Sequence, residues 1–179
     1  MEIIASYWEP RIRTYGFQKV TDLSLVEVTP GKGGMESLGL ALSRLGEWGI
    51  DFQLVFSCPS PEKPGISYLL TARHADGRLS EFIGQGGGSS PEGMFHVVSP
   101  VELVLFQGPH YGDRFGIVDA SLQALIAKGL GIVASVCSGS CVYLVVPEGK
   151  ADDVIMALSD AFEVPKAAPR CGSKPAATS

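Results

Sequence analysis

The chain shows one pattern of apolar positions twice, about 80 residues apart. In each copy, apolar residues recur at i, i+4 and i+7, the spacing of a helix with one buried face. These residues are Leu38, Leu42 and Leu45 in the first copy, and Val118, Leu122 and Leu125 in the second. An alternating strand pattern follows each helix, at Phe52, Leu54 and Phe56 and again at Ile132, Ala134 and Val136. The repeat is visible in the pattern and not in residue identity.

Each copy reads as strand, helix, strand, strand, helix, strand. The first has strands at 23–28, 52–56, 66–72 and 94–98, with helices at 35–48 and 76–83. The second has strands at 101–106, 132–136 and 141–146, a final stub at 163–165, and helices at 117–128 and 150–162. This order predicts an α+β fold of two ferredoxin-like units, each an antiparallel sheet with two helices on one face. Side-by-side pairing of copies would cover the other sheet face and hide sheet edges.

The pattern also divides the chain. Residues 1–18 are predicted to be an N-terminal arm or edge strand, 19–99 the first unit, 100–165 the second unit, and 166–179 a disordered tail. The glycine run at 84–93 has neither the Gly-Lys-Ser/Thr ending nor the following helix of a phosphate-binding loop. It is interpreted as a flexible surface loop.

Charge and cysteine content narrow the class of protein. The net charge is −5 and no stretch is basic, so we expect no nucleic-acid partner. No run of 18 apolar residues predicts a membrane span, and the N-terminus lacks the features of a signal peptide. A cytoplasmic protein with reduced cysteines is therefore expected. Cys137 and Cys141 flank a turn and are interpreted as small residues facing each other across a hairpin, with a redox or metal role as the alternative.

The most informative loop joins the predicted strand at 101–106 to the helix at 117–128. A glycine-bearing loop before a helix N-terminus offers free N–H groups to a carboxylate. Asp113 adds an anionic group that suits an ammonium, so the pair fits a free amino acid. The alternative for Asp113 is a helix cap. No Ser/His/Asp or Cys/His set stands at motif spacing, so we expect a non-catalytic chain that needs no cofactor and no metal.

Three motifs carry a resemblance to a known family. The segment Asp113-Arg-Phe-Gly-Ile-Val118 is similar to the Asp-Arg-Pro-Gly-Ile-Val signature of ACT domains. The segments starting at Gly49 and Gly131 resemble the Gly-Ile-Asn-Ile second strand of that family. The ending Ala157-Leu-Ser-Asp-Ala-Phe-Glu163 resembles that of aspartate kinases. Residues 19–165 therefore look like a tandem pair of ACT domains, similar to the C-terminal regulatory region, or small subunit, of aspartate kinases.

The resemblance implies an amino-acid effector held between paired copies, by the loop after the first strand and the start of the second strand. The residues at these positions are Lys32, Gly33, Gly34, Met35, Ser37, Asp51 and Gln53 in the first copy, and Asp113, Arg114, Gly116 and Ile117 in the second. Backbone N–H groups near 34–35 or 116–117 would bind the α-carboxylate, and Asp51 or Asp113 the α-ammonium. Asp51 and Gln53 otherwise belong to the solvated face of a half-buried strand, and Lys32 and Arg114 to the surface.

The sequence departs from the family at several positions. Phe115 replaces the signature proline, the first copy has no aspartate in its loop, and Ser140 stands where many aspartate kinases carry a glutamate. The kinase half is not expected in this chain. Three functions stay open: a homodimeric amino-acid-binding regulator, a regulatory subunit bound to an aspartate kinase catalytic chain, and an interaction module without a ligand.

Overall fold

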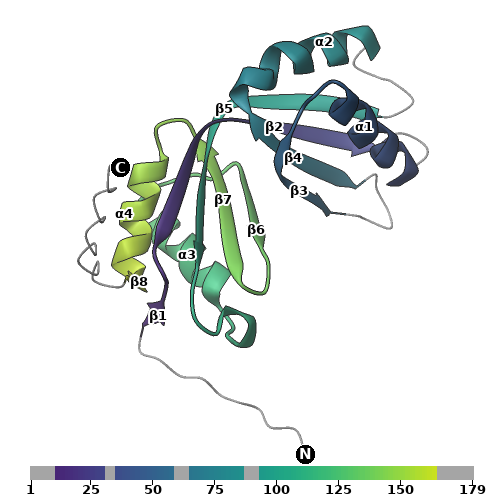
Figure 1. Ribbon diagram of the computed structural model, residues 1–179. Coiled ribbons are helices and arrows are strands. Elements are labelled where there is room, and N and C mark those ends of the chain that lie inside the picture. Colours follow the sequence, from purple (N-terminus) through teal and green to yellow (C-terminus); the bar gives the residue numbers. More distant parts are fainter. Residues whose placement is uncertain (1–10, 31–34, 59–64, 87–92, 165–179) are drawn as a thin grey trace, which may run out of the picture.

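The structure, a computed structural model, describes residues 11–30, 35–58, 65–86 and 93–164. Its centre is a six-stranded sheet with the order β3-β4-β2-β5-β7-β6, in which all neighbours are antiparallel (Figure 1). The strands are β2 (Phe17–Pro30), β3 (Phe52–Cys58), β4 (Ile66–Ala72), β5 (Gly93–Gln107), β6 (Ala134–Cys137) and β7 (Cys141–Pro147).

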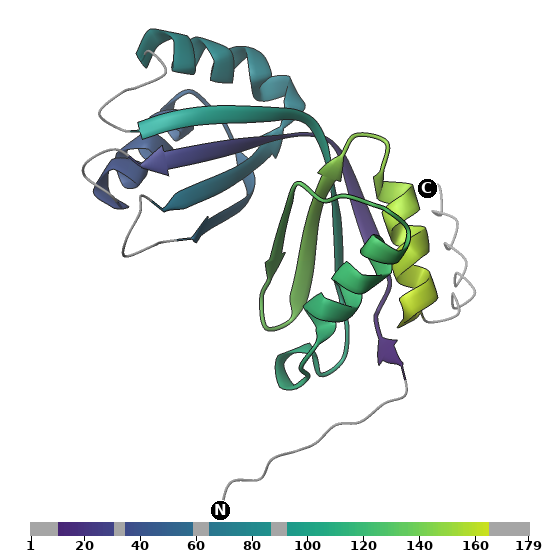
Figure 2. The same cartoon turned by 180° about the vertical axis from the view of Figure 1, so that it is seen from behind.

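Two long strands, β2 and β5, run through both halves of the molecule. Residues 23–30 of β2 and 93–98 of β5 join β3 and β4 in the first half, which the helices α1 (Met35–Glu47) and α2 (Asp76–Gly86) cover. Residues 17–20 of β2 and 101–107 of β5 join β6 and β7 in the second half, which α3 (Ile117–Ala127) and α4 (Ala151–Ala161) cover. Each half has the predicted ferredoxin-like arrangement, with its helices on one face (Figures 1 and 2).

The prediction that a strand ends at Ser99 and Pro100 is wrong, because β5 continues through both residues. The ladder with β2 is irregular here: Leu25 pairs with Val98 and Leu23 with Val101. Proline has no N–H to donate, so it is tolerated where the ladder is interrupted. The irregularity also changes which positions face the helices: Val97 belongs to the helix-facing core of the first half, and Val104 to that of the second.

The final strand of the second half is also not where the sequence placed it. Within the described part of the stub predicted at 163–165, only Glu163 is in a strand, the two-residue β8 (Phe162–Glu163), which pairs in parallel with β1 (Ile12–Arg13) outside the main sheet. The fourth strand position is held by residues 17–20, from the other end of the chain. The ring of Phe17 supports this placement, since it lies 5.2 Å from that of Phe106 and 6.4 Å from that of Phe162. Residues 11–18, the described part of the segment predicted as an arm, are thus a structural part of the second half, and residues 1–10 lie outside the described residues.

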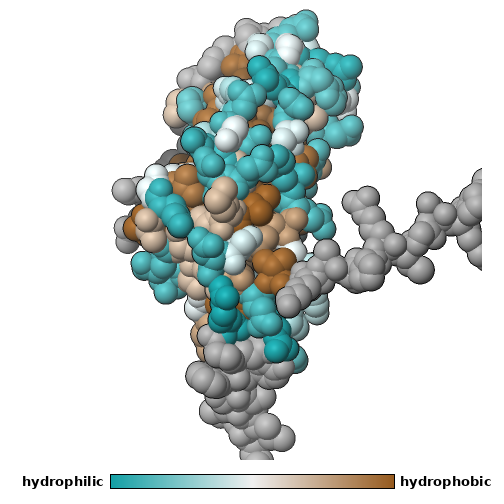
Figure 3. All heavy atoms as spheres, turned by 90° about the vertical axis from the view of Figure 1, so that its left-hand side faces the viewer, coloured by the Kyte–Doolittle hydropathy of each residue, from teal (hydrophilic) through white to brown (hydrophobic). Residues whose placement is uncertain are grey.

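Three buried clusters hold the fold together. One lies under α3 and α4 in the second half, and a matching one lies under α1 and α2 in the first half. The third lies on the sheet face without helices and contains buried residues of both halves, Leu25 and Leu70 from the first and Leu103 and Val145 from the second. This shared cluster buries apolar residues on the sheet face without helices, the face that pairing of copies was expected to cover. Figure 3 shows that apolar side chains are interspersed with polar ones on the α4 side of the molecule.

The core face of α3 differs from the predicted one. Leu125 is buried as expected, but its buried neighbours are Ile117 and Ser121, whereas Val118 and Leu122 are only half-buried. Ser121 is accommodated because its hydroxyl donates to the Ile117 carbonyl at 2.7 Å. Eight of the eleven residues of this helix are apolar, so spacing alone did not fix which face is buried.

Two helices end at glycines. Gly49 and Gly129 have the left-handed φ values of 69° and 65° that suit glycine just beyond a helix C-terminus. Among the helices of the described residues, none is long and apolar enough to cross a membrane.

Candidate functional site

The predicted ligand-binding residues lie in three separate places along the length of β5: near its start, near its middle and after its end. Met35 and Ser37 are in the first turn of α1, which follows the end of β2 that pairs with Gly93. Asp51 and Gln53 lie near the middle of the molecule, because Phe52 pairs with Thr71, and Thr71 with Ser24. Arg114, Gly116 and Ile117 follow the far end of β5 at Gln107. Lys32, Gly33 and Gly34 are outside the described residues.

This separation decides which residues can share a ligand. Asp51 lies at about the level of Leu23 on β2, and Met35 follows Pro30 at the end of that strand. The seven residues from Leu23 to Pro30 span about 23 Å at 3.3 Å per residue. A free amino acid cannot contact both Asp51 and the backbone of Met35 within one chain. The two ends of β5 are about 46 Å apart along the strand, and the first and second loops lie at opposite ends of it.

Asp51 and Gln53 do share a surface hollow, with a volume of about 200 Å3. It lies where β3 begins and β4 ends, next to the three-residue 3-10 turn η1 (Arg73–Ala75). Its lining residues are Gly49, Asp51, Gln53, Thr71, Ala72, His74 and Ala75. The hollow thus combines a carboxylate, an amide and an imidazole in a space of amino-acid size.

The local backbone explains why these side chains converge. The register of β3 against β4 shifts between Phe52 and Leu54, so Gln53 is the extra residue of a β-bulge. Bulges re-aim a side chain and are frequent beside binding sites. The hydroxyl of Thr71, 1% exposed, donates to the Asp51 carbonyl at 2.7 Å and fixes the start of the strand.

An arginine fixes the backbone at Gly49, which lines the hollow just beyond the end of α1. Arg78 donates through Nη1 to the carbonyl of Gly49 at 3.1 Å and to that of Trp48 at 3.4 Å. A cation at a helix C-terminus is favourable, because the last carbonyls are without helical partners. A Cβ at Gly49 would lie 3.0 Å from the same Nη1, so glycine suits this position both for its φ and for its size.

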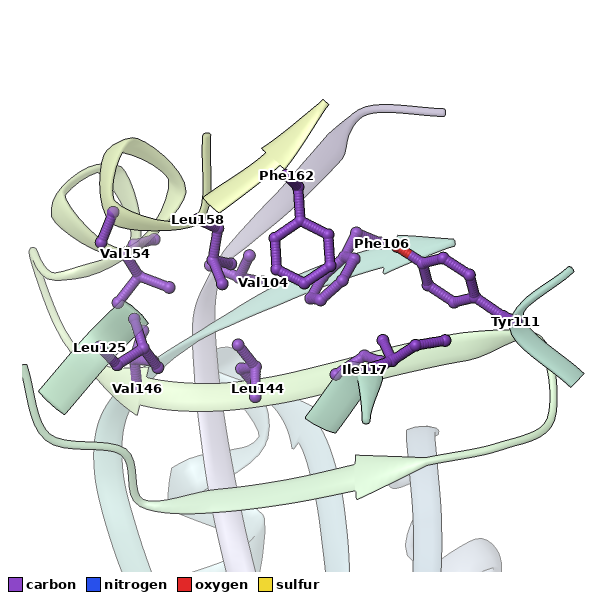
Figure 4. Packing of buried hydrophobic residues seen from close by; sticks show 13 residues of the cluster. Val104, Phe106, Tyr111, Ile117, Leu125, Leu144, Val146, Val154, Leu158 and Phe162 are labelled. Carbon is purple, nitrogen blue, oxygen red and sulfur yellow. The ribbon is translucent and has the colours of Figure 1, made fainter. Parts of the chain in front are cut away.

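The loop after β5 is packed tightly. A Cβ at Gly108 would stand 2.2 Å from the Arg13 carbonyl oxygen and 2.4 Å from the Tyr111 ring. Tyr111 points into the second-half core toward Phe106 (Figure 4), with ring centroids 6.1 Å apart. Within the part of the chain that the structure describes, the buried Tyr111 hydroxyl has no hydrogen-bond partner. Burial raises the pKa of Tyr111 to about 12, and Thr14 and Arg114 oppose this effect only in part.

The start of α3 corrects one interpretation of Asp113. Asp113 ends the short 3-10 turn η2 (Tyr111–Asp113), and the cap position of α3 is held by Gly116, with φ 83° and no side-chain cap. Asp113 is therefore not the cap residue. Ile117 is 4% exposed and packs in the core, so only its backbone N–H is available to a ligand. The second loop retains N–H groups at a helix start, and its residues do not line the hollow that contains Asp51.

The two cysteines of the hairpin do not face each other as expected. Cys137 pairs with Val142 and is exposed, whereas Cys141 pairs with Gln107 and is buried. Partial desolvation by its neighbours raises the pKa of the Cys137 thiol, and Cys141 adds to this effect, which disfavours the reactive thiolate. Within the described residues, no group of three or more His, Cys, Asp or Glu side chains forms a metal site.

Sequence reasoning missed Thr71 and His74. Thr71 is the one polar residue at the apolar end of β4, which is a weak signal for a binding site. His74 follows in the 3-10 turn, and only the fold brings it to Asp51.

No protein-family model matches the chain, and no curated protein sequence matches it. Solved structures do match. The regulatory subunit of aspartate kinase from Thermus flavus superposes with a TM-score of 0.70 at 15% identity, covering 84% of this chain and 99% of that subunit. A structure of aspartokinase alpha and beta subunits gives 0.71 at 13% identity, with coverages of 84% and 99%. The chain has the fold of an aspartate kinase regulatory region.

A longer enzyme shares this fold over part of its length. E. coli aspartokinase III, solved in complex with lysine and aspartate, gives a TM-score of 0.63 at 15% identity. The match covers 88% of this chain and 35% of that enzyme. The predicted resemblance to tandem ACT domains is confirmed for the fold, and at these identities the comparison carries no residue-level role.

Proposed function

We propose that the chain is a non-catalytic regulatory protein that binds a free amino acid in the hollow at the start of β3. The observation that carries this proposal is that Asp51 and Gln53, selected from the sequence for this role, line one hollow with His74. The Asp51 carboxylate would pair with the α-ammonium, and the Gln53 amide and the His74 ring would donate to the α-carboxylate.

The position of the hollow suits a regulator. It lies beside the junction of the two halves, where Arg73 of the first half approaches Glu148 of the second at 3.5 Å. A ligand that binds one arrangement of the halves better than another shifts the population toward that arrangement. A partner enzyme in contact with the second half would then respond to an amino acid bound in the first.

A thermal-shift screen against the twenty amino acids tests the proposal. A ligand at 100 times its Kd adds about 2.7 kcal/mol of stability, which raises the Tm of a chain this long by about 5–10 °C. Asp51→Asn should abolish the response, and Asp119→Asn, which changes an exposed aspartate of the second half, should preserve it. A response lost only in Asp113→Ala would move the site to the second loop. A flat screen would favour an interaction module without a ligand.

A second candidate is a regulatory subunit of an aspartate kinase. It is favoured by the match to the Thermus flavus subunit, because that subunit is covered almost completely. The measurement is affinity purification of the tagged chain from its own cells, followed by mass spectrometry. Recovery of an aspartate kinase catalytic chain in equal amount would support this candidate, and its absence from a reversibly cross-linked sample would count against it.

A further inference from the structure

The chain passes from one half to the other in β2 and again in β5, and both strands are irregular at that level. In the β2–β5 ladder, β2 carries one extra residue at 21–22 and β5 carries one at 99–100. Asp22 has a left-handed φ of 56°, which is uncommon for residues other than glycine. Bulges bend a strand, and Figure 1 shows β2 and β5 bending where they leave one half for the other. Two neighbouring bulges have the geometry of a hinge, because a few element positions can absorb a change of backbone angle.

A carboxylate ties both bulged strands to helix α2. Asp76, the first residue of α2, accepts a hydrogen bond from the Ser24 hydroxyl of β2 at 2.6 Å and one from the Ser99 hydroxyl of β5 at 2.9 Å. The two hydroxyl oxygens are 2.9 Å apart. Ser24 is completely buried and stands opposite the extra residue of β5. We call Asp76, Ser24 and Ser99 the clasp. Hydrogen bonds to a carboxylate are strong and directional, so the clasp opposes a change of angle at the hinge.

Two other contacts join the halves, and both restrain the angle less. The shared apolar cluster, which contains Leu25 of the first half and Leu103 of the second, resists separation of the halves. Burial of apolar surface is non-directional, so this cluster tolerates a rotation. Arg73 and Glu148 pair across the halves, but their side chains are 47% and 57% exposed, and exposed pairs contribute little. The clasp supplies the directional restraint that these contacts lack.

The clasp lies directly beside the hollow at the start of β3. His74 lines the hollow and belongs to the turn η1, in which the Arg73 carbonyl accepts a hydrogen bond from the backbone N–H of Asp76. Thr71 also lines the hollow, and it is the ladder partner of Ser24. One tight turn and one ladder pair therefore join the hollow to the clasp, so a change in the position of one is felt by the other.

We propose that the clasp is the switch through which an amino acid in the hollow sets the angle between the two halves, an inference that rests on the proposed function of the hollow. A ligand that bridges Asp51 and His74 would hold η1 against the start of β3, and η1 presents Asp76 to both serines. Ligand and clasp therefore stabilise the same arrangement of the halves. By reciprocity, loss of the clasp weakens ligand binding by the factor by which the ligand tightens the clasp.

Amide hydrogen exchange of the full chain, read by mass spectrometry, tests the clasp without any ligand. Asp76→Ala removes the acceptor of both serines. We expect exchange in the peptides covering 20–25 and 98–103 to become about 10- to 100-fold faster, as for the loss of hydrogen bonds to a charged group. Ser99→Ala, which leaves the buried Ser24–Asp76 bond in place, should give a smaller increase in the same two peptides.

The matched control is Asp153→Ala, which also removes an aspartate from the first turn of a helix. It should change exchange at the start of α4 and leave both peptides unchanged. Circular dichroism of each variant verifies folding. Unchanged exchange in both Asp76→Ala and Ser99→Ala would overturn the clasp, whatever the ligand screen shows. Faster exchange confined to α2 would reduce Asp76 to a residue of the helix start and would overturn it as well.

The same measurement with an equimolar mixture of the twenty amino acids tests the coupling. In the unmodified chain the mixture should slow exchange in both peptides by about 5-fold or more, and Asp76→Ala should remove this effect. If one amino acid raises the Tm but the mixture leaves both peptides unchanged, the coupling is wrong and the proposed function stands. A flat Tm screen overturns the proposed function and the coupling together, and exchange without ligand then still decides the clasp.

Discussion

Removal of the Glu102 side chain should destabilise the second half through the start of α4. Glu102 lies on β5, is 8% exposed, and accepts a hydrogen bond through Oε2 from the N–H of Ala151 at 2.9 Å. Ala151 is completely buried, and Lys150 at the cap position makes no side-chain cap bond. Glu102 thus supplies from the sheet the acceptor that a capping residue normally supplies.

The magnitude follows from two effects of Glu102→Ala. The buried N–H of Ala151 would lose its acceptor, which costs about 1–3 kcal/mol. The helix would also lose an anion at its N-terminus, worth about 0.3–1 kcal/mol and up to 2 in a partly buried site. We expect a decrease of about 2–4 kcal/mol in the free energy of unfolding. Glu102→Gln retains an oxygen acceptor and should lose only the charge effect.

Urea denaturation followed by circular dichroism measures these differences. The matched control is Asp153→Ala, which removes an acidic group from the same first turn. Asp153 is exposed and paired with Lys150 at 3.2 Å, so this change should cost less than about 1 kcal/mol. Equal losses for Glu102→Ala and Asp153→Ala, or a loss below about 0.5 kcal/mol for Glu102→Ala, would refute the role given to Glu102.

Three further changes test the packing. Gly108→Ala should destabilise strongly, because its Cβ would overlap the Arg13 carbonyl and the Tyr111 ring; thermal denaturation with a near-native Tm would contradict this. Ser24→Ala should cost about 1–3 kcal/mol, because the buried Ser24 hydroxyl donates to Asp76 at 2.6 Å; unchanged urea stability would argue against it. The folded protein holds the Tyr111 proton more tightly than the unfolded chain, whose tyrosines titrate near pH 10. The resulting stability is present below pH 10 and lost as the pH rises toward 12, so a pH series should show a steeper loss for the natural chain than for Tyr111→Phe.

The fold was largely predictable because helix spacing and strand alternation are local signals. The α1 face of Leu38 and Leu45 is buried as expected. The sharing of β2 and β5 was not predictable. Judged from the local sequence, Pro100 should end a strand, and only the irregularity in the β2–β5 ladder beside it allows β5 to continue. Likewise, no local pattern showed that residues 17–20 would complete the second half.

The candidate site was predictable only in part. The family resemblance drew attention to Asp51 and Gln53, because they stand at the start of the second strand. The contributions of Thr71 and His74 depend on the β3–β4 register, which the sequence does not specify residue by residue. The loop positions near Met35 belong to the other end of the first half, so a motif that groups them with Asp51 describes no single-chain site.

The most direct test of the proposed function is an amide NMR titration of the labelled full chain with the amino acid that raises its Tm most. If the account is right, the largest shifts fall on Asp51, Gln53, Thr71 and His74 and disappear in Asp51→Asn. Shifts confined to the Arg114–Ile117 loop, or no shift for any of the twenty amino acids, would contradict it.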